Sequence, residues 1–494
     1  MTDSARRRLE RGGLALVALA GIAAWLRWHV EPTFDTAWSL LWGREAIHGV
    51  VPTFSAYRAP TEHPLWLGLG ILLAPFGDGE AARIATAVGV ASLVLLVAAV
   101  YRLGQVTFGA LAGLVAAVIL LTRLDFPFLA AFSFVDVPYL ALLVWAAVLE
   151  AERPRRGGPV LALLVLAGLL RPEAWGYLIA YVVWLGWRAT PRRRLALGAL
   201  AALPIVLWGL TDLIVTGDPA FSFTFTTNHA QEFDRQRGLV QVPGSTLSAL
   251  IEYLKWPILA GGVGGIVLAW RFFQPRARLE VPLAMLVLGL ASFVVTSAAG
   301  FAVIPRYLAF GALPLMVFCA YLFTGFLEQP RGGAARRRWA AGAAVLVVAG
   351  GAWQVAHLHP ASVTGEFAYR VRVERALREA LDAPATVAAR RCGPISVPNH
   401  KLVPYVRLMT GAPNGAVAAR SDPVEAARAA RGGAAIYLAG GLRLLDHSAY
   451  GMFGRQFRFD DTQAIAVPAP GFVPIHRNAQ FVVYARCPRA ARAS

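Results

Sequence analysis

The sequence of 494 residues contains very little lysine and few cysteines. Lys255 and Lys401 are its only lysines, so arginine carries nearly all of the positive charge. Several catalytic motifs are also missing: the chain has no Walker loop, no GxSxG, no HExxH and no CxxC pair. These absences argue against P-loop nucleotide chemistry, against serine hydrolases of the GxSxG type, and against HExxH zinc enzymes.

Hydrophobic residues make up 57% of the chain, and they form long runs separated by arginine clusters. A chain this long and this apolar does not fit a single soluble domain. The formal charge of +18 does not indicate nucleic-acid binding, because the arginines stand between apolar runs and do not form one basic face. We therefore interpret the chain as an integral membrane protein, with the lipid bilayer as a partner and no nucleic acid.

The apolar runs predict about eleven transmembrane helices, since about 20 apolar residues cross a bilayer and fewer suffice where the membrane thins. These spans lie near residues 12–28, 81–101, 106–122, 134–149, 158–170, 172–187, 195–216, 247–270, 279–299, 303–327 and 339–356. The apolar piece 64–76 is too short to cross and predicts an interfacial or re-entrant helix. The break at LLRPEAW, residues 169–175, leaves two alternatives open, a tight hairpin or one kinked helix.

The arginine clusters predict the topology of the chain. With eleven spans, the clusters around residues 6–11, 153–156, 188–194, 271–278 and 331–338 all fall on one side of the membrane. The positive-inside rule assigns that side to the cytoplasm. We therefore expect a multi-pass protein of the inner or plasma membrane, with a cytoplasmic N-terminus and an outward-facing C-terminal region.

From about residue 357 no apolar run is long enough to cross a membrane, and short strand-like runs alternate with helical ones. The sequence thus predicts a transmembrane domain at 1–356 and a small extracytoplasmic α/β cap domain at 357–494. Helices are expected at 366–381, 399–409 and 422–430, and strands at 385–391, 434–439, 462–468 and 479–486.

Two of the three cysteines fall in this predicted cap. Cys392 and Cys487 each end a strand-like run, and an outward-facing domain lies where thiols oxidise. Cys319 is sequestered in an apolar span and cannot compete. We predict a disulfide between Cys392 and Cys487, with two unpaired thiols as the alternative.

A polar, aromatic-rich loop at residues 31–66 holds the first candidates for chemistry. Asp35 follows the first apolar run, and a carboxylate at a membrane surface can take a proton from an acceptor hydroxyl. A solvated loop residue or a helix N-cap is the plain alternative. Glu62 and His63 close the loop, where they could bind a metal, position a donor phosphate, or merely lie at the interface.

A second group of ionisable residues lies at the outer ends of predicted spans. Charges at membrane depth are costly unless they face a cavity or a partner. An arginine there can grip a phosphate, or it can extend its charge to the interface. The members of this group are Asp125, which Arg123 could neutralise, Asp136 in the same outer connection, Arg171 with Glu173, and Arg306 with Tyr307.

The third outer loop, FSFTFTTNHAQEFDRQRG, offers His229 among aromatic, amide and carboxylate side chains. This mixture suits the lining of a sugar or metal site, but its spacing matches no metal motif. Glu62, His63 and His229 therefore stay open as metal ligands. A divalent metal is the cofactor that the sequence leaves undecided.

The order of these features resembles the GT-C superfamily of integral-membrane glycosyltransferases, which includes protein O-mannosyltransferases, aminoarabinose transferases and RgtA/B/C/D-like proteins. The likeness rests on the acidic residue of the first outer loop, the EHPLW close, the LLRPEAW break, the IPRYLAFGALPL span and the outer cap. It covers most of residues 12–356.

The resemblance implies a polyprenyl-phosphate-linked sugar as donor, inversion of the anomeric centre, and Asp35 as general base. It also implies that Arg171 and Arg306 lie at basic positions associated with the lipid phosphate. The closely paired acidic residues that the superfamily often has in this loop are absent here. The second acid therefore stays open between Glu31, Glu62 and Asp125.

The sequence thus predicts a glycosyltransferase that acts on an extracytoplasmic glycan, lipid or protein acceptor of the cell envelope. The alternatives are a polytopic transporter and a non-catalytic scaffold for envelope assembly. Transporters often have paired halves with broken helices near the bilayer centre. Here no such pairing is visible, and the polar residues gather at the predicted outer boundary.

Overall fold

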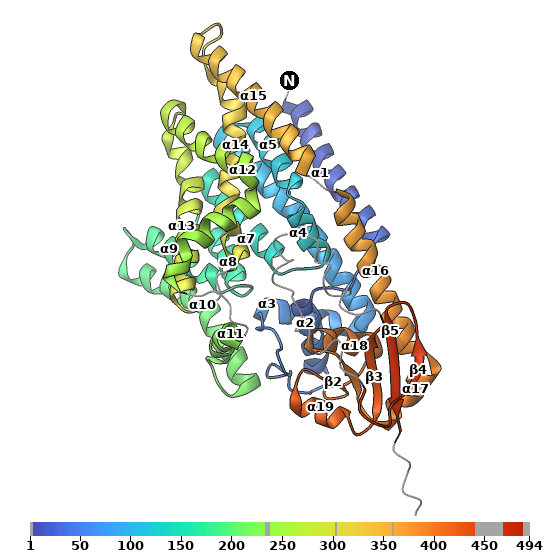
Figure 1. Ribbon diagram of the computed structural model, residues 1–494. Coiled ribbons are helices and arrows are strands. Elements are labelled where there is room, and N and C mark those ends of the chain that lie inside the picture. Colours follow the sequence, from blue (N-terminus) through green and yellow to red (C-terminus); the bar gives the residue numbers. More distant parts are fainter. Residues whose placement is uncertain (1–2, 233–237, 302–303, 358–359, 440–467, 488–494) are drawn as a thin grey trace, which may run out of the picture. The chain divides into compact units, whose positions relative to one another are not determined.

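The computed structural model describes residues 3–232, 238–301, 304–357, 360–439 and 468–487 (Figure 1). They form two compact units. The membrane unit, as we call it, comprises residues 1–24, 63–65 and 88–360, and the cap unit comprises residues 25–62, 66–87 and 361–494. The cap unit therefore joins most of the first predicted outer loop to the C-terminal region.

Helices make up nearly all of the membrane unit, and two of them, α1 and α4, continue into residues of the cap unit. Their bounds are α1 Asp3–Arg27, α4 Asp78–Phe108, α5 Ala110–Thr122, α6 Asp125–Ala131, α7 Asp136–Glu152, α8 Gly158–Gly168, α9 Glu173–Gly186, α10 Pro191–Thr216, α11 Phe221–Glu232, η2 Leu239–Gln241, α12 Val242–Phe272, η3 Arg276–Leu279, α13 Glu280–Ala298, η4 Pro305–Leu308, α14 Ala309–Thr324, η5 Gly325–Glu328 and α15 Ala334–His357.

Helix α14 forms the core of this unit, since nearly all of its residues are buried. Glycines allow α12 and α13 to approach it closely. A Cβ atom on Gly265 of α12 would lie 1.9 Å from the carbonyl oxygen of Phe318, and one on Gly289 of α13 would lie 2.4 Å from the Cα of Gly311. Such small-residue contacts are typical of helix packing in membranes, where dispersion contacts replace the hydrophobic drive.

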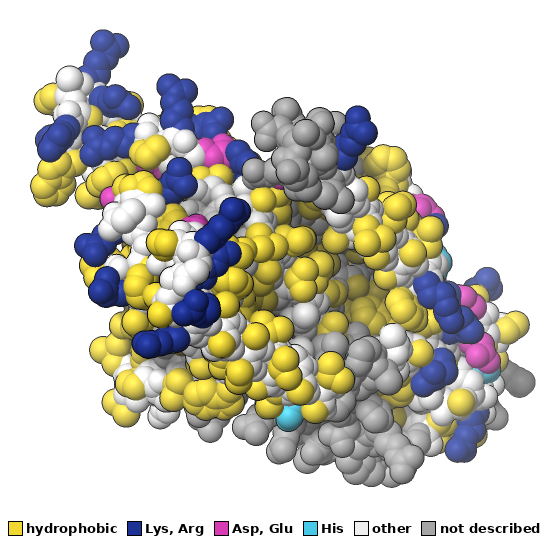
Figure 2. Space-filling model, turned by 90° about the horizontal axis from the view of Figure 1, so that it is seen from above, with side chains coloured by type: hydrophobic (Ala, Val, Ile, Leu, Met, Phe, Trp, Pro, Cys, Tyr) yellow, Lys and Arg dark blue, Asp and Glu magenta, His cyan; other side chains and the backbone are white. Residues whose placement is uncertain are grey.

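The surface of the membrane unit is strongly apolar. Large side chains such as Leu195, Ile214, Val267 and Val345 are mostly exposed, as lipid-facing side chains would be. Figure 2 shows hydrophobic side chains covering much of one face of the molecule, with Lys and Arg side chains gathered among them. The chain is a multi-pass membrane protein.

The number of spans differs from the prediction of about eleven. A helix lies at each predicted position. Only six helices of the described chain are long and apolar enough to cross a bilayer, or seven if the bent pair Ala110–Thr122 and Asp125–Ala131 is one span. The prediction failed at the first span, where the apolar helix Gly12–Arg27 is short, and between α5 and α9, where charges and prolines interrupt the apolar runs. The predicted fold class, a polytopic helical protein with a small C-terminal α/β region, is confirmed.

The cap unit packs short helices on a five-stranded sheet of order β2-β1-β3-β5-β4. Strand β1 is parallel to β2 and β3, while β5 is antiparallel to β3 and β4. The bounds are α2 Phe34–Ile47, α3 Pro64–Leu73, η1 Ala74–Phe76, α16 Pro360–Asp382, α17 Pro384–Ala389, η6 Arg390–Cys392, β1 Ile395–Val397, η7 His400–Leu402, α18 Val403–Thr410, β2 Val417–Ala419, α19 Pro423–Ala429, β3 Gly433–Leu438, β4 Val473–Arg477 and β5 Phe481–Arg486.

One expected strand of the cap is a helix. Residues 385–391 were predicted to be extended, but they form α17 and η6. Pro384 starts this helix at a position where its missing N–H costs nothing, and the alanines after it favour helix. Most of the predicted strand at 462–468 lies outside the described residues, and β4 pairs with β5.

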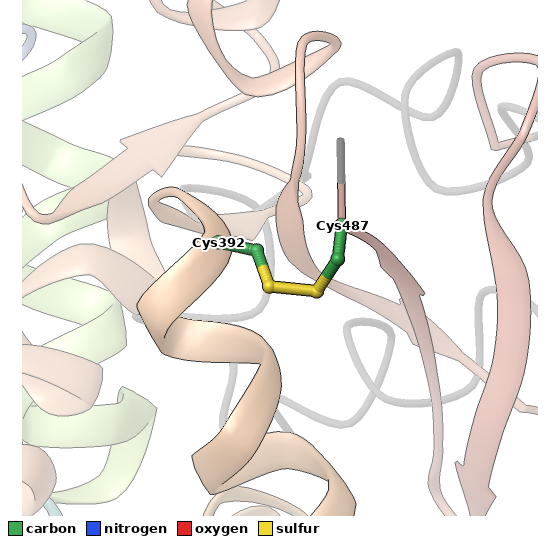
Figure 3. Close-up of a disulfide and its surroundings, with 2 residues drawn as sticks. All are labelled: Cys392 and Cys487. Atoms are coloured by element: carbon green, nitrogen blue, oxygen red, sulfur yellow. A yellow bond between two sulfur atoms is a disulfide. The ribbon is translucent and has the colours of Figure 1, made fainter. Parts of the chain in front are cut away.

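Cys392 and Cys487 form a disulfide in the cap unit (Figure 3). Their Cα atoms lie 5.0 Å apart, although 95 residues separate them in the sequence. Cys392 ends η6 and Cys487 follows β5, so the bond joins the end of the α17–η6 segment to the end of β5. Cys319 is buried in α14 as a free thiol.

Candidate functional site

The interrupted helices of the membrane unit bring a cluster of charged side chains together. Arg171, in the turn between α8 and α9, donates to Glu173 at 2.9 Å and also to Asp136 in the first turn of α7. All three side chains are buried. Buried charges are tolerated only when paired and hydrogen-bonded. We call these residues, with Arg306, the arginine–carboxylate cluster.

Arg306 is the most accessible member of this cluster. Its Nη1 lies 3.7 Å from Oδ2 of Asp136, and 22% of its side chain is exposed, against 6% for Arg171. The guanidinium of Arg171 donates hydrogen bonds to two carboxylates. Arg306 is therefore the arginine of the cluster that is more accessible to an anionic ligand.

Aromatic rings line the same cluster. The guanidinium of Arg171 lies 4.6 Å from the ring centre of Tyr307 and 5.6 Å from that of Tyr139. The guanidinium of Arg306 lies 5.9 Å from Tyr307. Cations over aromatic faces are stabilised most where water is scarce. The predicted pairs Arg171 with Glu173 and Arg306 with Tyr307 thus belong to one site.

His63 also belongs to this part of the membrane unit. Burial, and then the positive charges of Arg171 and Arg306, lower the pKa of His63 to about 3. The imidazole is therefore neutral at ordinary pH. The rings of His63 and Trp208 are nearly perpendicular, with their centres 6.0 Å apart. A neutral imidazole can accept or donate a hydrogen bond, but it adds no positive charge for a phosphate.

In the cap unit, Asp35 lies in the first turn of α2 with its side chain partly exposed. Thr33 is the N-cap, because its hydroxyl accepts from the N–H of Thr36 at 3.3 Å. The alternative that Asp35 caps the helix is therefore wrong. The positive end of the helix dipole favours a charged carboxylate at this position.

Helix α2 is held closely against α3. A Cβ atom on Gly43 would lie 2.1 Å from the carbonyl carbon of Gly70, so the two backbones almost touch. The indole N–H of Trp66 donates to the hydroxyl of Thr36 at 2.9 Å. These contacts fix the first turn of α2, where Asp35 lies.

A buried ion pair holds α2 against the C-terminal part of the cap unit. Arg407 of α18 donates to Oε1 of Glu45 at 2.6 Å, and the two side chains are 1% and 5% exposed. Glu45 also accepts from the N–H of Thr53 at 2.9 Å. The guanidinium of Arg407 lies 5.6 Å from the ring centre of Trp38, one helical turn after Asp35. The pair thus joins α2, which carries Asp35, to α18, and its two residues are 362 positions apart in sequence.

Glu31 lies just before α2 and meets α16. Its N–H donates to Oε2 of Glu374 at 3.1 Å, and its carboxylate accepts from Arg378 at 2.9 Å. Burial, with the neighbouring Glu31 carboxylate, raises the pKa of Glu374 to about 8. Burial also raises the pKa of Glu31, against the opposing effect of Arg378.

The other predicted site residues lie elsewhere. Glu62 is buried in the loop before α3. Asp125 lies 3.6 Å from Arg123 in the membrane unit, so the neutralising alternative holds there. His229 belongs to α11, and its side chain is outside the described residues. Among the residues that the structure describes, no three His, Cys, Asp or Glu side chains form a group that could hold a metal ion.

Sequence reasoning missed two contacts. It named Asp136 as a charge at membrane depth, but it did not predict that Asp136 contacts both arginines of the cluster. The Arg407–Glu45 pair also went unnoticed. Its signal was a charged residue inside YVRLM, which is amphipathic and buried on one side.

No protein-family model and no curated protein matches this sequence. Among solved structures, the chain is similar to ArnT from Cupriavidus metallidurans bound to undecaprenyl phosphate, with a TM-score of 0.58, 15% identity, and 98% of each chain covered. It is similar to the apo state of ArnT from Cupriavidus metallidurans with a TM-score of 0.54 and 13% identity, over 96% of this chain and 98% of that chain. The likeness shows a shared fold over nearly the whole chain, and it confirms the predicted GT-C resemblance at that level.

Proposed function

We propose that this chain is a membrane-embedded glycosyltransferase that moves a sugar from a polyprenyl-phosphate donor to an extracytoplasmic glycan, lipid or protein acceptor of the cell envelope. The observation that carries the proposal is the fold likeness, over 98% of both chains, to ArnT bound to undecaprenyl phosphate. The donor implied by the sequence resemblance is of the same lipid class. The N-terminus would lie in the cytoplasm and the cap unit outside it.

In the proposed reaction, an acceptor hydroxyl attacks the anomeric carbon of the sugar as the bond from that carbon to the phosphate oxygen breaks. The phosphate leaves with the bonding electrons, the configuration inverts, and the hydroxyl proton passes to the carboxylate of Asp35. A lipid phosphate is already a good leaving group, so a modest base suffices. The support for Asp35 is its partly exposed position in the first turn of a helix held on two sides.

Arg306 is the residue that we assign to the departing phosphate. It is the more exposed arginine of the cluster, and a guanidinium suits the two oxygens of a phosphate. Arg171 would act through Asp136, by fixing the carboxylate that also faces Arg306. Stabilising the negative charge that develops on the leaving group is the largest contribution expected in such a reaction.

A genetic complementation experiment tests the proposal. We expect a strain that lacks this protein to lose one sugar decoration from its envelope glycans, lipids or proteins. The wild-type gene should restore it, and Asp35→Asn should not, although equal amounts of folded protein reach the membrane. Mass spectrometry of the isolated envelope fractions identifies the missing sugar and its acceptor.

Asp382→Asn is the matched control, because Asp382 is an exposed carboxylate at the end of α16. It should restore the decoration fully. Full restoration by Asp35→Asn would remove Asp35 as the base. An unchanged envelope in the deletion strain would instead favour the scaffold, and accumulation of an unmodified transported solute would favour the transporter.

A further inference from the structure

A groove with a volume of about 470 Å³ lies between α12, α14 and α15 of the membrane unit. It is separate from the arginine–carboxylate cluster, since none of the cluster residues lines it. Its walls are mainly apolar, with one arginine and one amide. The lining residues are Leu268, Phe272, Leu322, Gln329, Ala335, Arg338, Trp339, Gly342, Ala343 and Leu346.

The polar and apolar parts of this lining are separated along α15. Arg338 lies near the start of the helix, whereas Leu346 lies eight residues further on. At a rise of about 1.5 Å per residue, the two positions are about 12 Å apart along the helix axis. The groove thus leads from a charged mouth to an apolar interior, as a site for an amphipathic ligand requires.

The walls of the groove are well fixed. The indole N–H of Trp339 donates to the carbonyl oxygen of Leu322 at 2.8 Å, and its ring lies 5.6 Å from that of Phe272. A Cβ atom on Gly342 would meet no atom within 4 Å, so the space beside it is open. The groove is therefore a preformed feature of the packed helices.

The segments around the mouth carry a strong excess of positive charge. Residues 271–280 and 325–338 hold seven arginines but only Glu280 and Glu328 as carboxylates. None of the seven forms an ion pair with a carboxylate in the part of the chain that the structure describes. The arginines are Arg271, Arg276, Arg278, Arg331, Arg336, Arg337 and Arg338.

Of these seven arginines, Arg338 is the one in the lining of the groove. Arg276, Arg336 and Arg337 donate to backbone carbonyl oxygens five to seven residues earlier in the chain. Arg338 is exposed and has no hydrogen bond or ion pair to any described residue. Its guanidinium is thus available to a ligand in the groove. Figure 2 views this end of the membrane unit, with Lys and Arg side chains beside hydrophobic ones.

We propose that this groove binds an anionic glycerophospholipid of the membrane, with the lipid phosphate at Arg338 and an acyl chain along Trp339, Gly342 and Leu346. Because α15 is almost entirely exposed and apolar, the groove opens toward lipid. Each arginine near an anionic headgroup contributes about 1 kcal/mol, and a zwitterionic headgroup gains much less. The site does not depend on the proposed transferase activity.

Native mass spectrometry of the delipidated full-length protein tests this site. The probes are phosphatidylglycerol, phosphatidylcholine with identical acyl chains, and undecaprenyl phosphate. We expect phosphatidylglycerol to bind more tightly than phosphatidylcholine. Arg338→Gln should weaken phosphatidylglycerol binding about fivefold, and Gly342→Leu, which fills the open space, should abolish binding of both phospholipids at this site.

Arg192→Gln is the matched control, because Arg192 is an exposed arginine in the first turn of α10, distant in sequence from the groove. It should leave the affinity unchanged. Equal losses in Arg192→Gln and Arg338→Gln would show a general charge effect and overturn the site. So would unchanged binding in Gly342→Leu with normal thermal stability, or tighter Arg338-dependent binding of undecaprenyl phosphate than of phosphatidylglycerol.

Discussion

Arg407 of the cap unit and Arg171 of the membrane unit are both buried, but they are paired in different ways. In the cap unit, Arg407 meets Glu45 in a one-to-one pair that joins segments 362 residues apart. In the membrane unit, Arg171 meets both Asp136 and Glu173, and Asp136 also faces Arg306. Arg407 thus has one carboxylate partner, whereas Arg171 has two.

This difference fits different tasks. A one-to-one buried pair is sensitive to any change, which suits a contact that fixes the position of α2. A cluster of two arginines and two carboxylates can lose one contact and keep the rest paired. In that arrangement the partly exposed Arg306 is the arginine that we propose meets the phosphate. The comparison thus separates a locked contact from an adjustable one, and four predictions test it.

The largest effect is expected for Arg407→Met. The substitution leaves the Glu45 carboxylate buried without its cation, which costs about 3 to 5 kcal/mol of stability in the cap unit. Hydrogen-exchange protection of β3 and β5 measures the loss. Replacing both partners, in Arg407→Met with Glu45→Leu, should recover most of it, because no uncompensated charge remains. Protection equal to wild type in the single variant would show that the pair is not a lock.

A smaller loss is expected for Asp136→Asn in the membrane unit. Arg171 keeps Glu173 at 2.9 Å, so the change removes charged hydrogen bonds without stranding a buried arginine. The expected cost is about 1.5 to 3 kcal/mol, seen as faster hydrogen exchange in α7 and α9. A loss as large as that of Arg407→Met would mean that the cluster has no partner in reserve, and the contrast between the units would fail.

The sequence was sufficient for the positions of the helices and for the α/β character of the C-terminal region. Apolar periodicity and helix-stop signals are local properties, and they marked a helix at every predicted span. The same local signals failed at residues 385–391, where an apolar run preceded by Pro384 was read as a strand. Alternation and helix periodicity cannot be distinguished in so short a run.

The candidate site was predicted less completely, because its contacts are not local. Arg171, Glu173, Arg306 and Tyr307 were named, since charges at span ends stand out in an apolar sequence. Their union through Asp136 depends on how α7, α8 and η4 pack, which no spacing encodes. The assignment of the first outer loop to the cap unit likewise depends on tertiary contacts such as Arg407 with Glu45.

The pH dependence of stability should differ between the units, and Glu374 sets the larger slope. Its pKa is about 8 in the folded cap and about 4.3 in an unfolded chain. Between these values the folded state retains a proton that the unfolded state has lost, so stability falls as pH rises. From pH 6 to 7 we expect a loss of about 1 kcal/mol, allowing for the partial exposure of the side chain.

Glu374→Gln should remove this slope, since the amide keeps an acceptor for the N–H of Glu31 and does not titrate. Hydrogen exchange of β5, corrected for the intrinsic pH dependence of exchange, provides the measurement. Glu379→Gln, an exposed carboxylate on the same helix, is the control and should retain the slope. An unchanged slope in Glu374→Gln would assign it to another group.

The smallest effect is expected from His63, and its sign is opposite. Its pKa is about 3 in the folded membrane unit and about 6.5 in an unfolded chain. Between these values the unfolded state binds a proton that the folded state excludes, so stability is complete above pH 6.5 and falls as pH decreases. From pH 7 to 6 the expected loss is about 0.7 kcal/mol, because the unfolded pKa lies at the centre of this window. His63→Gln should abolish it in the exchange of α8 and α9, while the cap unit keeps its own slope. If the membrane unit instead became more stable from pH 7 to 6, His63 would be charged in the fold, and it would join Arg306 as a cation for the lipid phosphate.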